Sequence, residues 1–71
     1  MFKVGDIVLH KKSNTQYDII ETPDKCFIEK GLVPAYAYSN YDKTKIFVRP
    51  QTEMEDGRFE VIGIVGETTI T

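Results

Sequence analysis

Short runs of β-branched and aromatic residues alternate with turn-forming residues along the chain. No stretch keeps apolar residues at the i, i+3, i+4 and i+7 spacing of an amphipathic helix, whereas short apolar runs recur between Gly, Pro, Asn and Asp. Strands of a small sheet have this sequence pattern, because alternate side chains point to opposite faces. The pattern therefore predicts a mostly β chain.

The first third of the chain predicts a β-hairpin. Residues 6–10 (DIVLH) and 16–21 (QYDIIE) are strand-like, and the polar sequence KKSNT lies between them. Asn14 falls where the turn benefits from a positive φ, which asparagine tolerates better than most other residues. We expect residues 6–21 to form the hairpin, entered through Gly5.

The middle of the chain is less regular and predicts a loop followed by a strand. Residues 22–34 contain two turn signals and only a short extended piece at 26–28. The sequence AYAYSNY, residues 35–41, then alternates small and aromatic side chains. If this segment is a strand, Tyr36 and Tyr38 share one of its faces.

The last third predicts two strands separated by one helical turn. Residues 45–49 (KIFVR) form the first, and Pro50 ends it because proline cannot donate a ladder hydrogen bond. Residues 51–54 are suited to a single turn of 3₁₀ helix. Asp-Gly then reverses the chain at Gly57 into the last strand, residues 58–65.

This order of elements is that of a small SH3-like β-barrel of about five strands, with one short 3₁₀ turn before the last strand. An OB-like barrel also fits short strands without crossover helices, but 71 residues are few for it. We expect one domain over residues 1–66 and a C-terminal tail at 67–71 that frays. The predicted core consists of Val4, Val8, Ile19, Phe27, Tyr38, Ile46, Val48, Phe59 and Val61.

The size and composition narrow the classes of protein. A chain of 71 residues with 41% hydrophobic and 28% charged residues is globular but too small for a large catalytic cleft. Its single cysteine, Cys26, cannot form an internal disulfide, which favours the cytoplasm. Neither a signal peptide nor a run of about 20 apolar residues is visible, so no membrane association is expected.

The charge is unevenly distributed. The net charge of −2 argues against a general nucleic-acid binder, because phosphate contacts supply sequence-independent affinity. Residues 32–49 carry three cations and one acid, whereas residues 50–71 carry Arg58 against five acids. Two such sectors can orient the encounter with a partner.

Three sequence blocks carry a family resemblance: HKKSNTQYDII, AYAYSNYDKTKIFVRP and TEMEDGRFEVI. Together they resemble a family of small, uncharacterised bacterial and phage proteins with the pattern H-K-x-[ST]-G-x-x-Y, V-Y-x-S and [WF]-V-R-P-x-x-x-F-x-D-G-R-F. The resemblance covers about residues 4–62. The matching positions are His10, Lys11, Ser13, Tyr17, Tyr38, Ser39, Phe47, Val48, Arg49, Pro50, Asp56, Gly57, Arg58 and Phe59.

The chain departs from that pattern at two positions, where Asn14 replaces glycine and Met54 replaces phenylalanine as an apolar plug. The resemblance implies a small barrel-like module, often in a phage or mobile-element setting, but it implies no reaction. In such a setting the partner would be a host protein in the host cytoplasm. The module would then be a host-takeover factor or an anti-defence factor.

The residues of known catalytic and metal sites are largely missing. Zinc-hydrolase and P-loop motifs are absent from the sequence. Cys26 and His10 would need an orienting group and an oxyanion hole, for which there is little room. The acids Glu53, Glu55 and Asp56 lack the spacing of a calcium loop and are typical of a solvated turn. We therefore expect no enzyme activity, no cofactor and no metal.

Tyrosines and arginines suggest a surface for a protein partner. Four tyrosines exceed what a tiny core can bury, and tyrosine is enriched at binding surfaces. The alternative is partial burial with satisfied hydroxyl groups. The planar guanidinium group of arginine suits the recognition of carboxylates and phosphates. A contribution to stability alone is therefore a weak explanation for the two arginines. The candidate partner-binding residues are Arg49, Arg58, Tyr36, Tyr41 and Tyr17.

Lysines at two turns suggest a second binding mode. If the turns lie close together, they form a basic face interleaved with tyrosines, which can contact phosphates and stack bases. The alternative is that these lysines only keep sheet edges soluble. The candidate nucleic-acid-binding residues are Lys11, Lys12, Lys43 and Lys45.

The interpretation is a non-enzymatic binding module, with a protein as the preferred partner and nucleic acid as the alternative. A third hypothesis is a subunit of a larger assembly, and the sequence leaves the oligomeric state open.

Overall fold

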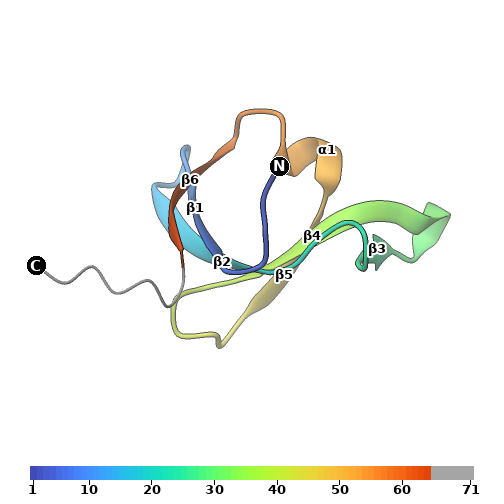
Figure 1. The fold of residues 1–71 in the computed structure, drawn as a ribbon, viewed down its shortest axis with the longest axis horizontal. Coiled ribbons are helices and arrows are strands. Elements are labelled where there is room, and N and C mark those ends of the chain that lie inside the picture. The colour runs from blue at the N-terminus through green and yellow to red at the C-terminus, as the bar shows by residue number, and fades with distance from the viewer. Residues whose placement is uncertain (65–71) are drawn as a thin grey trace, which may run out of the picture.

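The computed structural model describes residues 1–64, so the predicted tail at 67–71 and the end of the predicted last strand lie outside it (Figure 1). The strands are β1 (Asp6–His10), β2 (Thr15–Glu21), β3 (Phe27–Ile28), β4 (Val33–Ser39), β5 (Ile46–Pro50) and β6 (Phe59–Ile64). A 3₁₀ turn, η1 (Lys30–Leu32), precedes β4, and a single helical turn, α1 (Gln51–Met54), joins β5 to β6.

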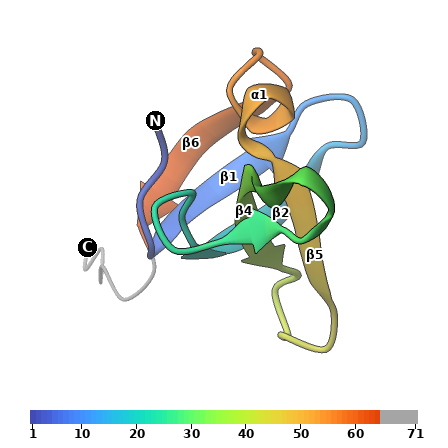
Figure 2. The same ribbon diagram turned by 90° about the vertical axis from the view of Figure 1, so that its right-hand side faces the viewer.

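The strands form one antiparallel sheet that curls around a small core. The order is β3-β4-β2-β1-β6, and β5 pairs with the other edge of β4. No ladder joins β5 to β6 within residues 1–64, so the barrel is open between them, below α1 (Figure 2). The predicted mostly β fold and its SH3-like order of elements are confirmed, with six strands instead of about five.

Local sequence explains the main turns. Asn14 has φ 56°, so the predicted positive φ in the β1–β2 turn is confirmed. The helical turn before the last strand also stands at its predicted place. Pro50, at φ −55°, leads into it, and the Glu55 N–H donates to the Gln51 carbonyl at 3.0 Å, which closes the turn in α rather than 3₁₀ fashion.

The core lies inside the curled sheet and is closed by α1. Its buried members are Val8, Ile19, Tyr36, Tyr38, Met54 and Phe59. The predictions for Val8, Ile19, Tyr38 and Phe59 are confirmed, as is the placing of Met54 as a plug. Tyr36 and Tyr38 share a face, as predicted from the alternation in β4.

Five predicted core residues are exposed, so the prediction was wrong for Val4, Phe27, Ile46, Val48 and Val61. The reason lies in the open barrel. Phe27, Ile46, Val48 and Val61 lie on β3, β5 and β6, which each pair on one side only, with β5 and β6 bordering the opening. Val4 precedes β1 and belongs to no strand. Apolar residues on an edge strand carry the same pattern as buried ones, and the pattern alone does not separate the two cases.

Tyr36 is a buried structural residue. Its side chain is 0% exposed, and the Phe2 ring packs edge-on against it at 5.4 Å. Its hydroxyl accepts from the Phe2 N–H at 3.1 Å and donates to the Glu55 carboxylate at 2.5 Å. Tyr36 thus connects the N-terminal segment to α1.

These contacts shift two pKa values in opposite directions. Burial, followed by the hydrogen bond to Glu55, raises the pKa of Tyr36 from 10.0 to about 12. The same hydrogen bond lowers the pKa of Glu55 below its usual 4.5. The contact is therefore strongest when Tyr36 is protonated and Glu55 is ionised.

We expect Tyr36→Phe to lower the free energy of unfolding by about 1–2 kcal/mol at neutral pH, because a hydrogen bond to a charged group is lost. The raised tyrosine pKa stabilises the wild type below pH 10.0, and this contribution is lost as the pH rises toward about 12. The lowered glutamate pKa stabilises it above pH 4.5 and is lost on acidification. Urea unfolding across this range measures both effects.

The two proteins should therefore differ most on the plateau between the acid and alkaline limbs and converge outside it. Because Glu55 is exposed, the acid limb should be the smaller one. A difference that stays constant from acid to alkaline pH would contradict this account of the contact.

Candidate functional site

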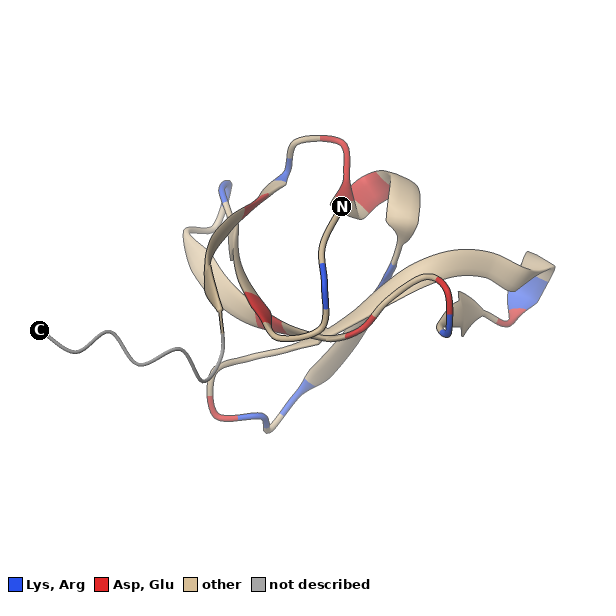
Figure 3. Cartoon of the chain, viewed as in Figure 1, with Lys and Arg blue, Asp and Glu red and all other residues tan. Residues whose placement is uncertain are grey.

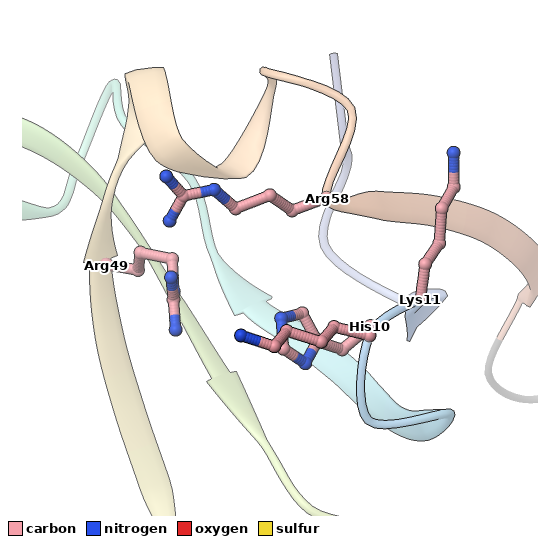
Figure 4. A pocket seen from close by; sticks show the side chains of 5 residues that line it. His10, Lys11, Arg49 and Arg58 are labelled. Carbon is pink, nitrogen blue, oxygen red and sulfur yellow. The ribbon is translucent and has the colours of Figure 1, made fainter.

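Basic side chains surround one hollow at the open side of the barrel. The hollow has a volume of about 610 Å³ and is lined by His10, Lys11, Lys12, Arg49 and Arg58. In Figure 4, Arg49, Arg58 and His10 face this hollow from three parts of the chain, while Lys11 extends away from them. We call this feature, defined by the five lining residues, the basic hollow.

The end of β5 places Arg49. Arg49 pairs with Tyr36 of β4, and Pro50 then turns the chain into α1. Glu53 lies in that helical turn, and its Oε1 comes within 3.4 Å of Nη1 of Arg49. The V-R-P sequence thus sets a cation at the mouth of the barrel and an acid beside it.

The turn between α1 and β6 places Arg58 opposite. Gly57 adopts φ +102°, a conformation that glycine alone adopts readily, and the Asp56 carboxylate accepts from the Arg58 N–H at 3.2 Å. The Arg58 carbonyl accepts from the Lys11 N–H at 3.0 Å. This bond holds the lysines of the β1–β2 turn beside the start of β6.

Arg49 is held in position by aromatic residues. Its Nε donates to the Tyr38 hydroxyl at 3.2 Å, and its guanidinium lies 5.6 Å from the centre of the Phe59 ring. The hydrogen bond to Tyr38 raises the pKa of Arg49, and only 29% of its side chain is exposed. A guanidinium fixed in this way loses little freedom when it binds an anion.

Glu53 links the two arginines. One of its oxygens, Oε1, lies 3.4 Å from Nη1 of Arg49 and 3.4 Å from Nη1 of Arg58. Both distances are long for charge-assisted hydrogen bonds, which are usually about 2.7–2.9 Å. Arg58 is held more closely by Asp56, at 2.9 Å. The carboxylate of Glu53 is thus shared between two cations and bound tightly by neither.

The charges of the basic hollow do not cancel. Even without Lys11, which extends away, Lys12 and the two arginines are three cations, and the acids paired with the arginines, Glu53 and Asp56, are two. The hollow keeps an excess of positive charge in a chain whose net charge is −2. A local excess of this kind attracts an anionic group.

The structure separates the two lysine pairs of the predicted basic face. The β1–β2 turn lies at the upper left and the β4–β5 turn at the bottom of the molecule in Figures 1 and 3. Lys11 and Lys12 join the arginines, whereas the Lys43 ammonium binds Asp18 at 2.8 Å. The two lysine pairs therefore do not line one common hollow, although both turns border a second groove.

A shallow groove does connect the flanks of these turns, but it is not basic. It is lined by Asn14, Thr15, Gln16, Asn40, Tyr41 and Asp42. Tyr41 is 87% exposed there, far from full burial. It does not share a groove with Tyr36, which is buried, so the predicted surface role of Tyr36 was wrong.

Tyr17 belongs to an aromatic cluster behind the basic hollow. Its ring contacts those of Tyr38, Phe47 and Phe59, with centroids 5.0, 5.7 and 6.4 Å away. The ring of His10 lies against Phe59 at 4.8 Å, and its Nδ1 shares a hydrogen bond of 2.7 Å with Ser13. Tyr17 is half-buried and supports the hollow more than it offers a surface.

Sequence reasoning missed the roles of Tyr38 and Glu53 in this site. Tyr38 was expected in the core, and it also orients Arg49. Glu53 was assigned to a solvated acidic turn, and it lies between the arginines. The sequence held no clear signal for this contact, because Arg49 belongs to a strand and Glu53 to the helical turn beyond Pro50.

Cys26 and His10 were the candidate nucleophile and base. Burial raises the pKa of the Cys26 thiol, which disfavours the reactive thiolate, and Cys26 is not among the residues lining the hollow with His10. No group of three or more His, Cys, Asp or Glu residues within 1–64 is placed to hold a metal ion.

No family model, curated protein or solved structure matches this chain. Across residues 1–64, none of the helices has the length and apolar character needed to cross a membrane.

Proposed function

We propose that this protein is a non-enzymatic binding module whose basic hollow holds an anionic group of a protein partner. The observation that carries the proposal is the pair of guanidinium groups from Arg49 and Arg58 around one hollow, with only a loosely held carboxylate between them. A guanidinium group recognises a carboxylate with two parallel hydrogen bonds. The family resemblance adds a host protein as the natural partner.

The distribution of charge favours a protein over a nucleic acid. A nucleic-acid strand needs a row of cations along its phosphates. Here four of the nine lysines and arginines line one hollow, and the groove leading toward the other basic turn carries Asp42 and neutral residues. A compact cluster suits one or two acidic side chains of a folded or extended protein segment.

A short oligo-glutamate peptide is a defined probe for this site. We expect it to shift the backbone NMR resonances of His10, Lys11, Lys12 and Arg58 while those of Lys43 and Lys45 stay unchanged. Lys12→Gln should weaken the binding by about two- to fivefold, because one exposed ion pair contributes about 0–1 kcal/mol. Lys25→Gln removes the same charge from an exposed position outside the hollow and should change the affinity less.

Single-stranded DNA of equal charge separates the alternative function from this one. Tighter binding of DNA than of oligo-glutamate, with a steep loss of affinity in salt and shifts at both basic turns, would favour nucleic acid. Absence of binding to either probe at low salt would remove the support for an anion site.

A further inference from the structure

Glu53 shows which chemical group fits between the two arginines. Its carboxylate lies where an incoming anion would contact both Nη1 atoms, and it belongs to the chain itself. The side chain of Glu53 is 44% exposed, so it can leave this position for solvent without crossing the core. The site is therefore occupied by an internal carboxylate that has a way out.

The two arginines hold Glu53 equally and only loosely. Arg49 has committed its Nε to Tyr38, and Arg58 has committed its Nε to Asp56. Each offers Nη1 to Glu53 at the long distance of 3.4 Å. A guanidinium has five N–H donors, so further donors of both arginines remain for a second acceptor.

We propose that the ligand group of the basic hollow is a carboxylate of an acidic protein segment, and that it binds by displacing Glu53 from between Arg49 and Arg58. This inference rests on the proposed function and adds both the ligand class and an internal competitor. A ligand carboxylate that approaches from solvent can make the short, two-pronged contacts that the tether of Glu53 to α1 prevents. The unliganded protein thus keeps its arginines paired, and binding exchanges one carboxylate for another.

Glu53→Gln tests the exchange. The amide keeps the size of the side chain but removes the charge that competes, so the affinity for oligo-glutamate should rise by about two- to fivefold. Glu60→Gln is the matched control, because Glu60 is an exposed acid two residues after Arg58 and forms no ion pair within residues 1–64. It makes the same change in net charge and should raise the affinity clearly less.

A second readout follows the arginines directly. In the free proteins, the Nε–H NMR resonances of Arg49 and Arg58 should differ between wild type and Glu53→Gln. At saturation with oligo-glutamate they should coincide, because Glu53 has then left the arginines in the wild type as well. Inorganic phosphate serves as a parallel probe for a single anion that is not a carboxylate.

Several outcomes would overturn this inference. Equal affinities of wild type and Glu53→Gln, or equal gains from Glu53→Gln and Glu60→Gln, would show that Glu53 does not compete, while the anion site itself would stand. Binding of phosphate without binding of oligo-glutamate would show that the ligand group is not a carboxylate. If neither probe binds either protein, the proposed function fails together with the inference.

Discussion

Met54→Ala is expected to lower the free energy of unfolding by about 2–5 kcal/mol, the usual range for truncating a buried methionine. Met54 is 0% exposed and belongs to the same core as Tyr36 and Phe59. A domain of 71 residues has roughly 4–11 kcal/mol of stability in all. The variant should therefore lose a large share of its stability, which urea titration followed by circular dichroism would measure.

Two further variants separate packing from helix formation. Met54→Leu keeps most of the volume and should cost less than about 1.5 kcal/mol. Thr52→Ala changes an exposed residue of the same helical turn and should be nearly neutral. If Met54→Ala proved as stable as Thr52→Ala, α1 would not close the core in the way the structure indicates.

Much of the fold could be predicted because local and tertiary preferences agree. Residues 6–10 were predicted as a strand with the bounds that β1 has, since Gly5 and the KKSNT turn delimit an apolar run. Asn14 predicted a positive φ, and Pro50 predicted the end of β5. In each case one residue type restricts the backbone whatever its neighbours are.

Burial at the sheet edges could not be predicted in the same way. Val48 and Val8 occupy similar apolar runs, but one lies on an edge strand and the other on a central strand. The difference is set by where the barrel opens, and this depends on which strands pair. The opposite error was made for Tyr36, which was predicted to be exposed because of its polar hydroxyl group. It is buried, and a hydrogen bond to Glu55 makes its burial favourable.

The candidate site was partly visible in the sequence. Arg49 and Arg58 stood out because stability explained them poorly, and the structure brings both to one hollow. Lys11 and Lys12 lie at the same hollow because β1 pairs with β6, which is far away in the sequence. The sequence showed the cations but not which of them share a site.

The double substitution Arg49→Gln and Arg58→Gln is expected to abolish measurable binding of oligo-glutamate. A hydrogen bond to a charged group contributes about 1.5–3 kcal/mol, so each arginine accounts for roughly tenfold to a hundredfold in affinity. The single variants should rank by how well each arginine is oriented. Arg49, fixed by Tyr38 and Phe59, should cost more than Arg58, which is held by acids at the surface. Calorimetric titration measures each loss.

The free energy of unfolding of each arginine variant must be measured together with its affinity, because Arg49 also supports the aromatic cluster. Arg49→Lys keeps the charge but loses the planar fork that reaches both Tyr38 and a carboxylate, so it should bind more weakly than wild type while the ring contacts of Tyr17, Tyr38 and Phe59 remain. Loss of folding in both Arg49→Gln and Arg58→Gln would return the two arginines to a structural role. Folded variants with unchanged affinity would exclude the basic hollow as the anion site. A folded Arg58→Gln with weakened binding would separate recognition from stability, because Arg58 is exposed and contacts only Glu53 and Asp56 by ion pairs within residues 1–64.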